Sequence, residues 1–587
     1  MPKLTDLLPW NAAPKALQYA DRGLAELHYL RKIIESGAFR LEPPLNYAAM
    51  AADIRRWGEI GMLPSFNARR TPNKTAIIDD EGEVTYKELE EAANAVAHGL
   101  LAKGVRGGDG VAILARNSRW FAIAGFGCAR VGARIILLNS SFSGPQIKEV
   151  SEREDAKLII YDDEYAKDVQ EAKPELGKLR ALGTNPDSDK ESGSTDETLA
   201  DLIGHSSKEP APKATKHSSV IILTSGTTGT PKGANRSTPP SLGPIGGILS
   251  HVPFKAGEVT SLPAPIFHAL GFLHFTIGMF LGSTLVLHRK FKPDVVLKDI
   301  EKHKVTAVVV VPVMLSRMLD ALEKMDKRPD LSSLRIIFVS GSALPPDLAE
   351  RTLKEIGPVL YNMYGSTEIA FATIAEPKHL QMNPSTAGPV VKGVKVKIFD
   401  DNGKELPQGE VGRIFVGSSF PFEGYTGGGN KQIINGMLSS GDVGYFDENN
   451  LLFISGRDDE MIVSGGENVF PAEVEDCISG LPDVVEATAI GVEDKEWGHR
   501  LKAFVVKKEG SDLDEDTIKK HVRDQLAKYK VPREVVFLDE LPRNPTGKVL
   551  KRELREMDGD EEGKEGKDGK DQKDQKEKKD QKDKKEE

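Results

Sequence analysis

The sequence is poor in features that would point to several protein classes. It has only two cysteines in 587 residues, Cys128 and Cys477, which excludes a disulfide framework and favours a reducing compartment. It also has no excess of positive charge, because 79 Lys and Arg stand against 89 Asp and Glu, for a formal net charge of −10. Since a dedicated nucleic-acid binder usually carries a basic stripe, we expect no nucleic-acid partner.

Long uninterrupted apolar segments are also scarce. Residues 1–30 mix charged and apolar side chains and do not resemble a secretory signal. Residues 259–288 contain no Asp, Glu, Lys or Arg, and such a length could cross a bilayer of ~30 Å. However, Pro263, Pro265 and several glycines interrupt this segment, which favours a buried core. We therefore expect a cytoplasmic protein, with peripheral membrane contact left open.

The N-terminal residues have the pattern of an amphipathic helix. Apolar residues recur among charged ones at positions that suit one helical face, namely Tyr19, Leu24, Leu27, Leu30, Ile33 and Ile34. Such a helix could contact membrane lipid or pack on the rest of the protein. We favour packing.

Most of the chain alternates between short β-rich runs and helical patterns. The runs are at 111–114, 135–138, 158–161, 220–223, 307–311 and 336–339, which predicts an α/β fold with parallel sheets covered by helices. Thr85 and Glu88 have the spacing of a capping box. Runs near 394–399 and 412–416 predict a small antiparallel β section. We predict four segments: an N-terminal helical extension at 1–60, a large domain at 61–457, a small α+β domain at 458–556, and a disordered charged tail at 557–587.

The most informative motif is a glycine- and hydroxyl-rich loop after an apolar run. Residues 224–233 read TSGTTGTPKG. Gly226 and Gly229 allow close approach of the backbone, and the hydroxyl and amide groups suit an anion. Lys232 adds a positive charge for phosphate. The spacing differs from the Walker loop G-x-x-x-x-G-K-[ST], which argues against an ordinary P-loop NTPase.

This loop resembles the phosphate loop of the adenylate-forming superfamily, the AMP-binding enzymes that include acyl-CoA synthetases, peptide-synthetase adenylation domains and luciferases. The other signatures of that superfamily follow in its usual order, at 263–268, 341–345, 364–368, 440–442, 455–457, 465–468 and 545–548. The resemblance covers residues 60–556. Within the superfamily, the chain is most similar to fatty acyl-CoA synthetases of the actinobacterial type.

The resemblance implies a reaction in two halves. A carboxylate attacks the α-phosphate of ATP to give acyl-AMP and pyrophosphate, and a thiol then displaces AMP. ATP, Mg²⁺ and coenzyme A are the implied cofactors or substrates. The small domain is implied to rotate between the two halves, with Asp459 as its hinge. The sequence contains no convincing Ser-His-Asp or Cys-His arrangement, which suits a reaction that depends on charge neutralisation and positioning.

The family pattern also implies roles for individual residues. The catalytic set is Lys548, Thr367, Glu368 and His268, where Glu368 is also the magnesium ligand and His268 has a role in the acyl pocket. The nucleotide and coenzyme A set is Thr224, Ser225, Gly226, Thr227, Thr228, Gly229, Lys232, Gly341, Ser342, Ala343, Tyr364, Gly365, Asp442, Arg457, Gly465 and Gly466. Positions 341–345 read GSALP, and Ser440 precedes Gly441 where many relatives have Thr, so this sequence departs from the family pattern at both places.

The residues around His268 suggest the substrate. Amino-acid-activating relatives place Asp directly after the Phe that is Phe267 here, and His268 cannot pair with an amine in the same way. The neighbouring residues are mainly apolar, which favours a medium- or long-chain fatty acid. No carrier-protein segment follows residue 556, so coenzyme A is the expected acceptor. A ligase that loads a separate carrier protein, an aryl-acid CoA ligase, and an inactive nucleotide-binding scaffold remain open, as does an oligomer.

Overall fold

The computed structural model forms two compact units. The residues that it describes are 15–40, 42–181, 194–224, 232–236, 241–418, 422–426, 428–458, 460, 462–464, 467–494, 498–526, 530–544 and 547–557. The large unit is Met1–Ile454 with Pro545–Gly547, and the small unit is Ser455–Asn544 with Lys548–Glu587. Asp459, the predicted hinge residue, and the part of the predicted tail from residue 558 onward lie outside the described residues.

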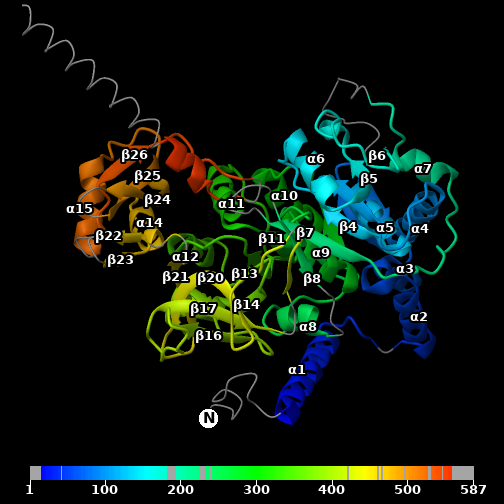
Figure 1. The fold of residues 1–587 in the computed structure, drawn as a ribbon, viewed down its shortest axis with the longest axis horizontal. Coiled ribbons are helices and arrows are strands. Elements are labelled where there is room, and N and C mark those ends of the chain that lie inside the picture. The colour runs from blue at the N-terminus through cyan, green and yellow to red at the C-terminus, as the bar shows by residue number, and fades with distance from the viewer. Residues whose placement is uncertain are drawn as a thin grey trace, which may run out of the picture. The chain divides into compact units, whose positions relative to one another are not determined.

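The first sheet of the large unit has eight strands in the order β14-β13-β12-β11-β9-β10-β1-β2. Its strands β11, β13 and β14 are labelled in Figure 1. Their bounds are β1 Thr75–Asp79, β2 Gly82–Thr85, β9 Val259–Ser261, β10 Thr284–Val286, β11 Ala307–Val310, β12 Ile336–Val339, β13 Leu360–Ser366 and β14 Ala370–Ala375. The inner strands pair in parallel, and only β2 and β14 at the two edges pair antiparallel. The carboxyl ends of β11, β12 and β13 therefore meet at one edge, where α/β sheets commonly bind ligands.

A second sheet has seven strands in the order β18-β8-β7-β4-β3-β5-β6. Its strands are β3 Gly110–Leu114, β4 Arg134–Leu137, β5 Ala156–Tyr161, β6 Lys178–Arg180, β7 Ser219–Thr224, β8 Lys232–Arg236 and β18 Phe422–Tyr425. The central strands are buried and parallel, as near-continuous apolar runs predict. Strands β8 and β18 close one edge in antiparallel pairing.

A third sheet of the large unit is antiparallel, as the sequence predicted. It runs β15-β21-β20-β17-β16, with β19 paired to β20. Its strands are β15 Thr386–Gly388, β16 Lys395–Phe399, β17 Gly412–Gly417, β19 Ile433–Ile434, β20 Met437–Phe446 and β21 Leu452–Arg457, the last of which continues into the small unit. Together the three sheets confirm the predicted α/β class.

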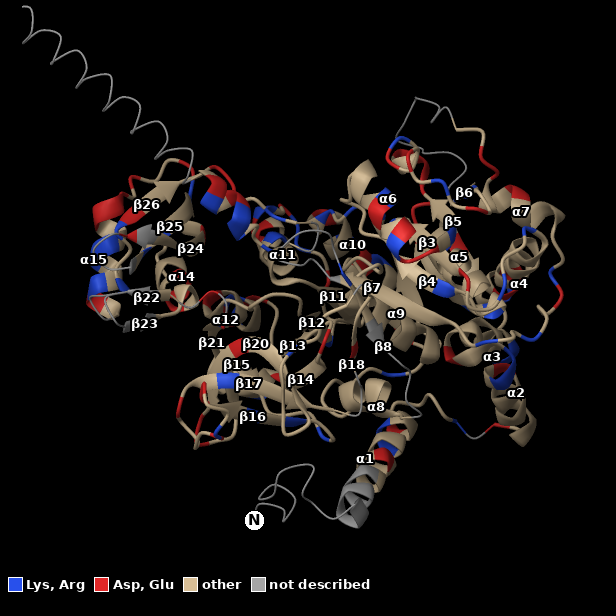
Figure 2. Ribbon diagram, viewed as in Figure 1, with Lys and Arg blue, Asp and Glu red and all other residues tan. Residues whose placement is uncertain are grey.

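Helices connect most of the strands. They are α1 Lys15–Glu35, α2 Pro44–Gly61, α3 Leu63–Arg70, α4 Tyr86–Ala102, α5 Arg119–Val131, α6 Gly144–Arg153, α7 Leu199–His205, α8 Gly243–Leu249, α9 Ala269–Phe280, α10 Pro293–His303, α11 Pro312–Lys324, α12 Pro346–Glu355 and α13 Pro377–Met382. The capping box predicted at Thr85 and Glu88 is present at the start of α4. Acidic and basic residues are interspersed along helices such as α1 and α6 (Figure 2).

The N-terminal helix packs on the protein through a face that the sequence did not single out. Ala25, Tyr29 and Ile33 of α1 are buried. Among the predicted apolar residues with described side chains, only Ile33 is buried, whereas Leu24, Leu27, Leu30 and Ile34 are exposed. The helix is apolar on two sides, and the pattern alone could not tell which side has a partner.

The segment that lacks charged side chains folds into β9, α9 and β10, and most of it is buried. Over the described ranges, the structure contains no helix with the length and apolar character needed to span a bilayer.

The small unit is α+β. Its sheet runs β23-β22-β25-β24, with β26 paired to β25. The elements are β22 Ile462–Ser464, β23 Glu467–Val469, α14 Pro471–Ser479, β24 Val484–Asp494, β25 Gly498–Lys507, α15 Glu515–Gln525 and β26 Glu534–Phe537. Its own hydrophobic core includes Val474, Ile478, Ala503 and Ile518, all buried.

Candidate active site

The predicted phosphate loop falls in the sequence between β7 and β8, which are neighbours in the second sheet. Strands β7 and β8 pair antiparallel, and Thr224 lies opposite Lys232. The predicted loop residues Ser225, Gly226, Thr227, Thr228 and Gly229 lie outside the described residues, as does the side chain of Thr224. The two ends of the predicted loop are therefore adjacent. Lys232 is the basic residue of the motif that the structure describes.

Lys232 is connected to Glu368 through a tyrosine that the sequence analysis missed. The Lys232 Nζ lies 5.6 Å from the centre of the Tyr425 ring, a cation–π distance. The Tyr425 hydroxyl donates a hydrogen bond of 2.6 Å to Glu368 Oε1. Pairing of β8 with β18 sets Tyr425 opposite Ala234, which brings Tyr425 beside Lys232. Lys232 and Glu368, the predicted magnesium ligand, thus belong to one contiguous group of side chains.

Glu368 is half-buried in the turn between β13 and β14. Its Oε2 accepts a hydrogen bond of 2.8 Å from the Ser366 hydroxyl, so each carboxylate oxygen has a donor. Burial by itself raises the pKa of Glu368, but the hydrogen bonds from Tyr425 and Ser366 outweigh it and lower the pKa. The carboxylate is therefore ionised at pH 7. Thr367 lies beside it in the same turn and is half-buried.

This carboxylate fits Mg²⁺. The Glu368 carboxylate is negatively charged at pH 7, and its oxygens are the hard ligands that Mg²⁺ prefers. Within the described ranges, no group of three or more His, Cys, Asp or Glu side chains is arranged to hold a metal. A single protein carboxylate is adequate, because Mg²⁺ is commonly held by one or two carboxylates together with water and substrate phosphates.

The predicted adenine and ribose residues also lie together. The Tyr364 hydroxyl on β13 donates a hydrogen bond of 2.6 Å to Asp442 Oδ2 on β20. Asp442 is held in turn by its own backbone N–H, which donates to the Ser440 hydroxyl at 3.0 Å. These contacts fix the orientation of the Asp442 carboxylate, the predicted acceptor for ribose hydroxyls.

The loop at Gly341 lies next to Tyr364 because β12 and β13 are parallel neighbours. Gly341 has φ +96°, a left-handed conformation that favours glycine, and Ser342 and Ala343 follow it with exposed positions. The Ser340 hydroxyl donates to the Met363 carbonyl at 2.8 Å and ties this loop to β13.

Gly365 allows β13 and β14 to approach each other closely. A Cβ there would lie 2.0 Å from the Ala370 carbonyl oxygen, a distance that no side chain tolerates.

His268 is the N-cap residue directly before α9, and its ring is close to an apolar neighbour. The ring centres of Phe267 and His268 are 4.5 Å apart. Its Nε2 atom is buried and has no hydrogen-bond partner among the described residues. Burial lowers the pKa of His268 to about 4, so the ring is neutral at pH 7. This state suits a pocket wall and not a general acid.

A second residue that the sequence analysis missed holds the segment before His268. The Asn117 amide nitrogen donates to the carbonyls of Leu262 (3.0 Å) and Ala264 (2.9 Å). Its carbonyl oxygen accepts from the Ile266 N–H at 2.8 Å. Nothing in the local sequence of Asn117 signals this role, since its partners are 145 to 149 residues away.

In the small unit, Lys548 is exposed on a loop with defined backbone contacts. Its N–H donates to Asn544 Oδ1 at 2.9 Å, and the Asn544 N–H donates to the Lys548 carbonyl at 2.9 Å. Arg457 ends β21. Gly465 and Gly466 lie outside the described residues, between the paired residues Ser464 and Glu467.

An ion-pair cluster anchors the chain just beyond Lys548. Lys551 is largely buried, and its Nζ lies 2.8 Å from Glu460 and 2.9 Å from Glu475. Burial by itself lowers the pKa of Lys551, but the two carboxylates outweigh it and raise the pKa. Glu475 Oε1 also accepts from the Thr488 hydroxyl and the Ala489 N–H. Lys551 therefore joins the lysine loop to α14, β24 and the segment that follows Arg457.

Comparison with known proteins identifies the family. The AMP-binding enzyme family matches residues 65–426, and the AMP-binding enzyme C-terminal domain matches residues 473–548. The chain belongs to the AMP-binding enzyme family. It is therefore an adenylate-forming enzyme of the group that includes acyl-CoA ligases and uses ATP.

Individual relatives of this family member act on different acids. A feruloyl-CoA synthase from an Amycolatopsis species is 33% identical over 85% of this chain and 99% of its own length. The fatty acid–acyl-carrier-protein ligase ScoC from Streptomyces coeruleorubidus is 31% identical over 84% of this chain and 95% of its own length. Among solved structures, the o-succinylbenzoate CoA synthetase MenE from Bacillus subtilis with its acyl-adenylate has a TM-score of 0.71 and 28% identity, covering 84% of this chain and 97% of that one.

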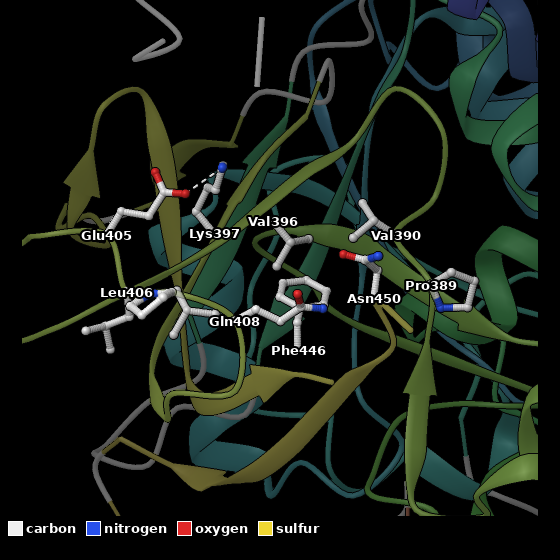
Figure 3. A pocket seen from close by; sticks show the side chains of 11 residues that line it. Pro389, Val390, Val396, Lys397, Glu405, Leu406, Gln408, Phe446 and Asn450 are labelled. Carbon is white, nitrogen blue, oxygen red and sulfur yellow. Dashed lines mark hydrogen bonds and ion pairs between the residues drawn. The ribbon is translucent and has the colours of Figure 1, made fainter. Parts of the chain in front are cut away.

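A separate cavity of about 470 Å³ lies beside the antiparallel sheet (Figure 3). Val396 and Phe446 contribute to its lining, together with Lys397 and Glu405, which form an ion pair at 2.5 Å. None of the predicted site residues lines it. We therefore assign it no part in the adenylation chemistry.

Proposed function

We propose that this enzyme activates a medium- or long-chain fatty acid as acyl-AMP and transfers the acyl group to coenzyme A. The contiguous group Lys232, Tyr425 and Glu368 carries the adenylation part of the proposal. It joins a phosphate-loop cation to an ionised carboxylate through contacts of 5.6 and 2.6 Å. These are the charges needed to hold the triphosphate of ATP.

Four residues of the protein have a defined part in the proposed first half-reaction. Lys232 attracts the phosphates, and Asp442 accepts hydrogen bonds from the ribose. Lys548 bridges the acid carboxylate and the α-phosphate and stabilises the charge that develops between them. Glu368 would hold Mg²⁺, which when bound neutralises phosphate charge. No side chain needs to remove a proton, because the acid is already ionised at pH 7.

The apolar neighbourhood of His268 supports a fatty acid. Ile266, Phe267, Leu270 and Phe275 are buried around the start of α9. The neutral ring of His268 offers no charge for an amine, in keeping with its low pKa of about 4. A hydrocarbon chain requires only such an apolar surface.

An aryl acid is the second candidate. The observation in its favour is the 33% identity to a feruloyl-CoA synthase over 85% of the chain. The aromatic neighbour Phe267 would suit either kind of acid.

Two assays on the full chain test the proposal. Acid-dependent exchange of pyrophosphate into ATP reports the first half-reaction, and thioester formation with coenzyme A reports the second. Both are run with acids from hexanoate to palmitate, and with ferulate, in the presence of Mg²⁺ and of a chelator. We expect exchange and thioester with a fatty acid. Exchange without thioester would favour a carrier-protein ligase, preference for ferulate would favour the aryl candidate, and no exchange with any acid would overturn the proposal.

A further inference from the structure

The N-terminal helix α1 makes hydrogen bonds to residues at both ends of α8. At the start of α8, Glu26 accepts from the Ser241 hydroxyl at 2.6 Å and from the Leu242 N–H at 2.9 Å. At its end, His28 Nε2 lies 3.0 Å from the Ser250 hydroxyl. The Ser250 hydroxyl donates its hydrogen to the Gly246 carbonyl at 2.6 Å, so His28 is the donor to Ser250. These three contacts hold α8 along its length.

Between those contacts, α1 and α8 approach too closely for a side chain. A Cβ on Gly246 would lie 2.3 Å from Tyr29 Cβ and 2.8 Å from Tyr29 Cα. Tyr29 is 3% exposed, and its hydroxyl donates to the Lys392 carbonyl. Burial raises the pKa of Tyr29 to about 12, so the hydroxyl remains a donor at pH 7. One side chain of α1 thus fixes both α8 and the 392 segment.

The next glycine of α8 lies against a residue close to the active site. A Cβ on Gly247 would lie 2.9 Å from Phe371 Cζ and 3.3 Å from Val391. Phe371 belongs to β14 and follows Glu368 by three positions. The Val391 N–H donates to the Ala372 carbonyl at 3.0 Å, which ties the 391–392 segment to β14 as well. Helix α8 and the 391–392 segment, which lie together at Gly247 and Phe371, are therefore both held by α1.

We infer that α1 is a specificity-determining element that sets the width of the acyl pocket at Phe371. The inference rests on the proposed function and adds to it that the hydrocarbon chain of the acid lies against Ile369, Ala370 and Phe371, the apolar residues that directly follow Glu368. Its ligand is the acyl chain of the acid, and its positioning residues are Glu26, His28 and Tyr29. Loosening α1 lets α8 move away from Phe371, which widens the pocket for bulky acids and loosens its fit to straight chains.

The test compares acid selectivity in the full-length enzyme. Tyr29→Ala removes the wedge between α8 and Lys392, and Gly247→Ala pushes directly on Phe371. We expect each to change the ratio of kcat/KM for straight-chain to branched or aryl acids by about tenfold, the size of a small misfit in an apolar pocket, while the KM for ATP stays within about twofold. Leu27→Ala is the matched control, because Leu27 is on the same helix and is 65% exposed. It should retain the selectivity of the unmodified enzyme.

Tyr29→Phe keeps the packing and removes the hydrogen bond to the Lys392 carbonyl. If Tyr29→Ala does not fold, Tyr29→Phe and Gly247→Ala together test the inference. Unchanged selectivity in the folded variants, or an equal rise in KM for the acid and ATP, overturns the inference.

Equilibrium titration with a fluorescent dansyl-undecanoic acid gives a readout that needs no turnover. Weaker or stronger probe binding in Tyr29→Ala but not in Leu27→Ala supports the inference even where exchange is absent, and that combination would overturn only the proposed function. Equal binding by both variants, or no binding by the unmodified enzyme, overturns the inference itself.

Discussion

The two units hold their candidate site residues in different ways. In the large unit, side chains far apart in sequence fix one another, because Tyr425 bonds to Glu368 and Tyr364 bonds to Asp442. In the small unit, the Lys548 side chain is exposed, and its loop is fixed by backbone contacts and by the nearby Lys551 cluster. The difference suggests a preorganised nucleotide platform in one unit and a cationic group carried on an anchored loop in the other.

The largest effect expected is that of Lys548→Ala. The exposed side chain contributes little to stability, so folding should be unchanged, whereas adenylation should fall by about 10²–10³-fold, the scale for loss of one group that stabilises transition-state charge. Pyrophosphate exchange measures this step. Thioester formation from supplied acyl-AMP should be largely retained, and an equal loss in both assays would contradict a role confined to the first half-reaction.

Breaking the Lys551 cluster should affect stability first. Lys551→Met leaves Glu460 and Glu475 without their cation, and loss of one partner of a buried pair costs about 3 kcal/mol. Amide hydrogen exchange in β24 and β25 should become faster, while exchange in β3 and β4 of the large unit stays the same.

Lys551→Arg is the control for that change, since it keeps the positive charge. It should recover most of the protection. Equal exchange in the Met and Arg variants would mean that the ion pairs do not hold the small unit together.

A smaller effect is expected for Glu368→Gln in the large unit. The amide keeps the shape of the side chain but loses the charge, so the Mg²⁺ concentration for half-maximal exchange should rise by about tenfold or more, as for lost groups at metal sites. Tyr425→Phe keeps the charge and removes one hydrogen bond, and it should shift the Mg²⁺ response less. A Mg²⁺ response identical to the unmodified enzyme in Glu368→Gln would exclude it as the metal ligand.

The smallest expected effect is a pH-dependent loss of stability in the large unit, which the small unit should not show. Hydrogen bonds from His288 to Asp299 and Asp80 outweigh burial and raise the pKa of His288 to about 9. The stabilisation of the folded state by protonated His288 is therefore complete below pH 6.5 and is lost as the pH rises through about 9. The raised pKa of Lys551 keeps the small-unit cluster charged over that range.

We therefore expect amide exchange in β1 and β10, corrected for its intrinsic pH dependence, to show lost protection between pH 7 and 9, while β24 keeps its protection. His288→Gln should remove this pH dependence. Equal losses in the two units would contradict the assignment to His288.

Local patterns were enough to predict much of this protein. Six apolar runs, from 111–114 to 336–339, became strands within one or two residues of their predicted ends, because buried parallel strands need continuous apolar residues. The capping box at Thr85 depends on residues three positions apart, and it was predicted correctly for that reason. The motifs also indicated Glu368, Asp442 and Lys232, and in the structure Lys232 and Glu368 both contact Tyr425, whereas Asp442 contacts Tyr364.

What the tertiary structure decided is which distant residues meet. Tyr425 reaches Glu368 across 57 residues and Asn117 reaches Ala264 across 147, and no local pattern records such contacts. For α1, the sequence established an amphipathic helix, but the close approach that Gly246 of α8 and Gly393 permit made room for Tyr29 and so selected the buried face. Short-range periodicity determines secondary structure, whereas the partners of a side chain depend on sheet order and on where small residues permit close approach.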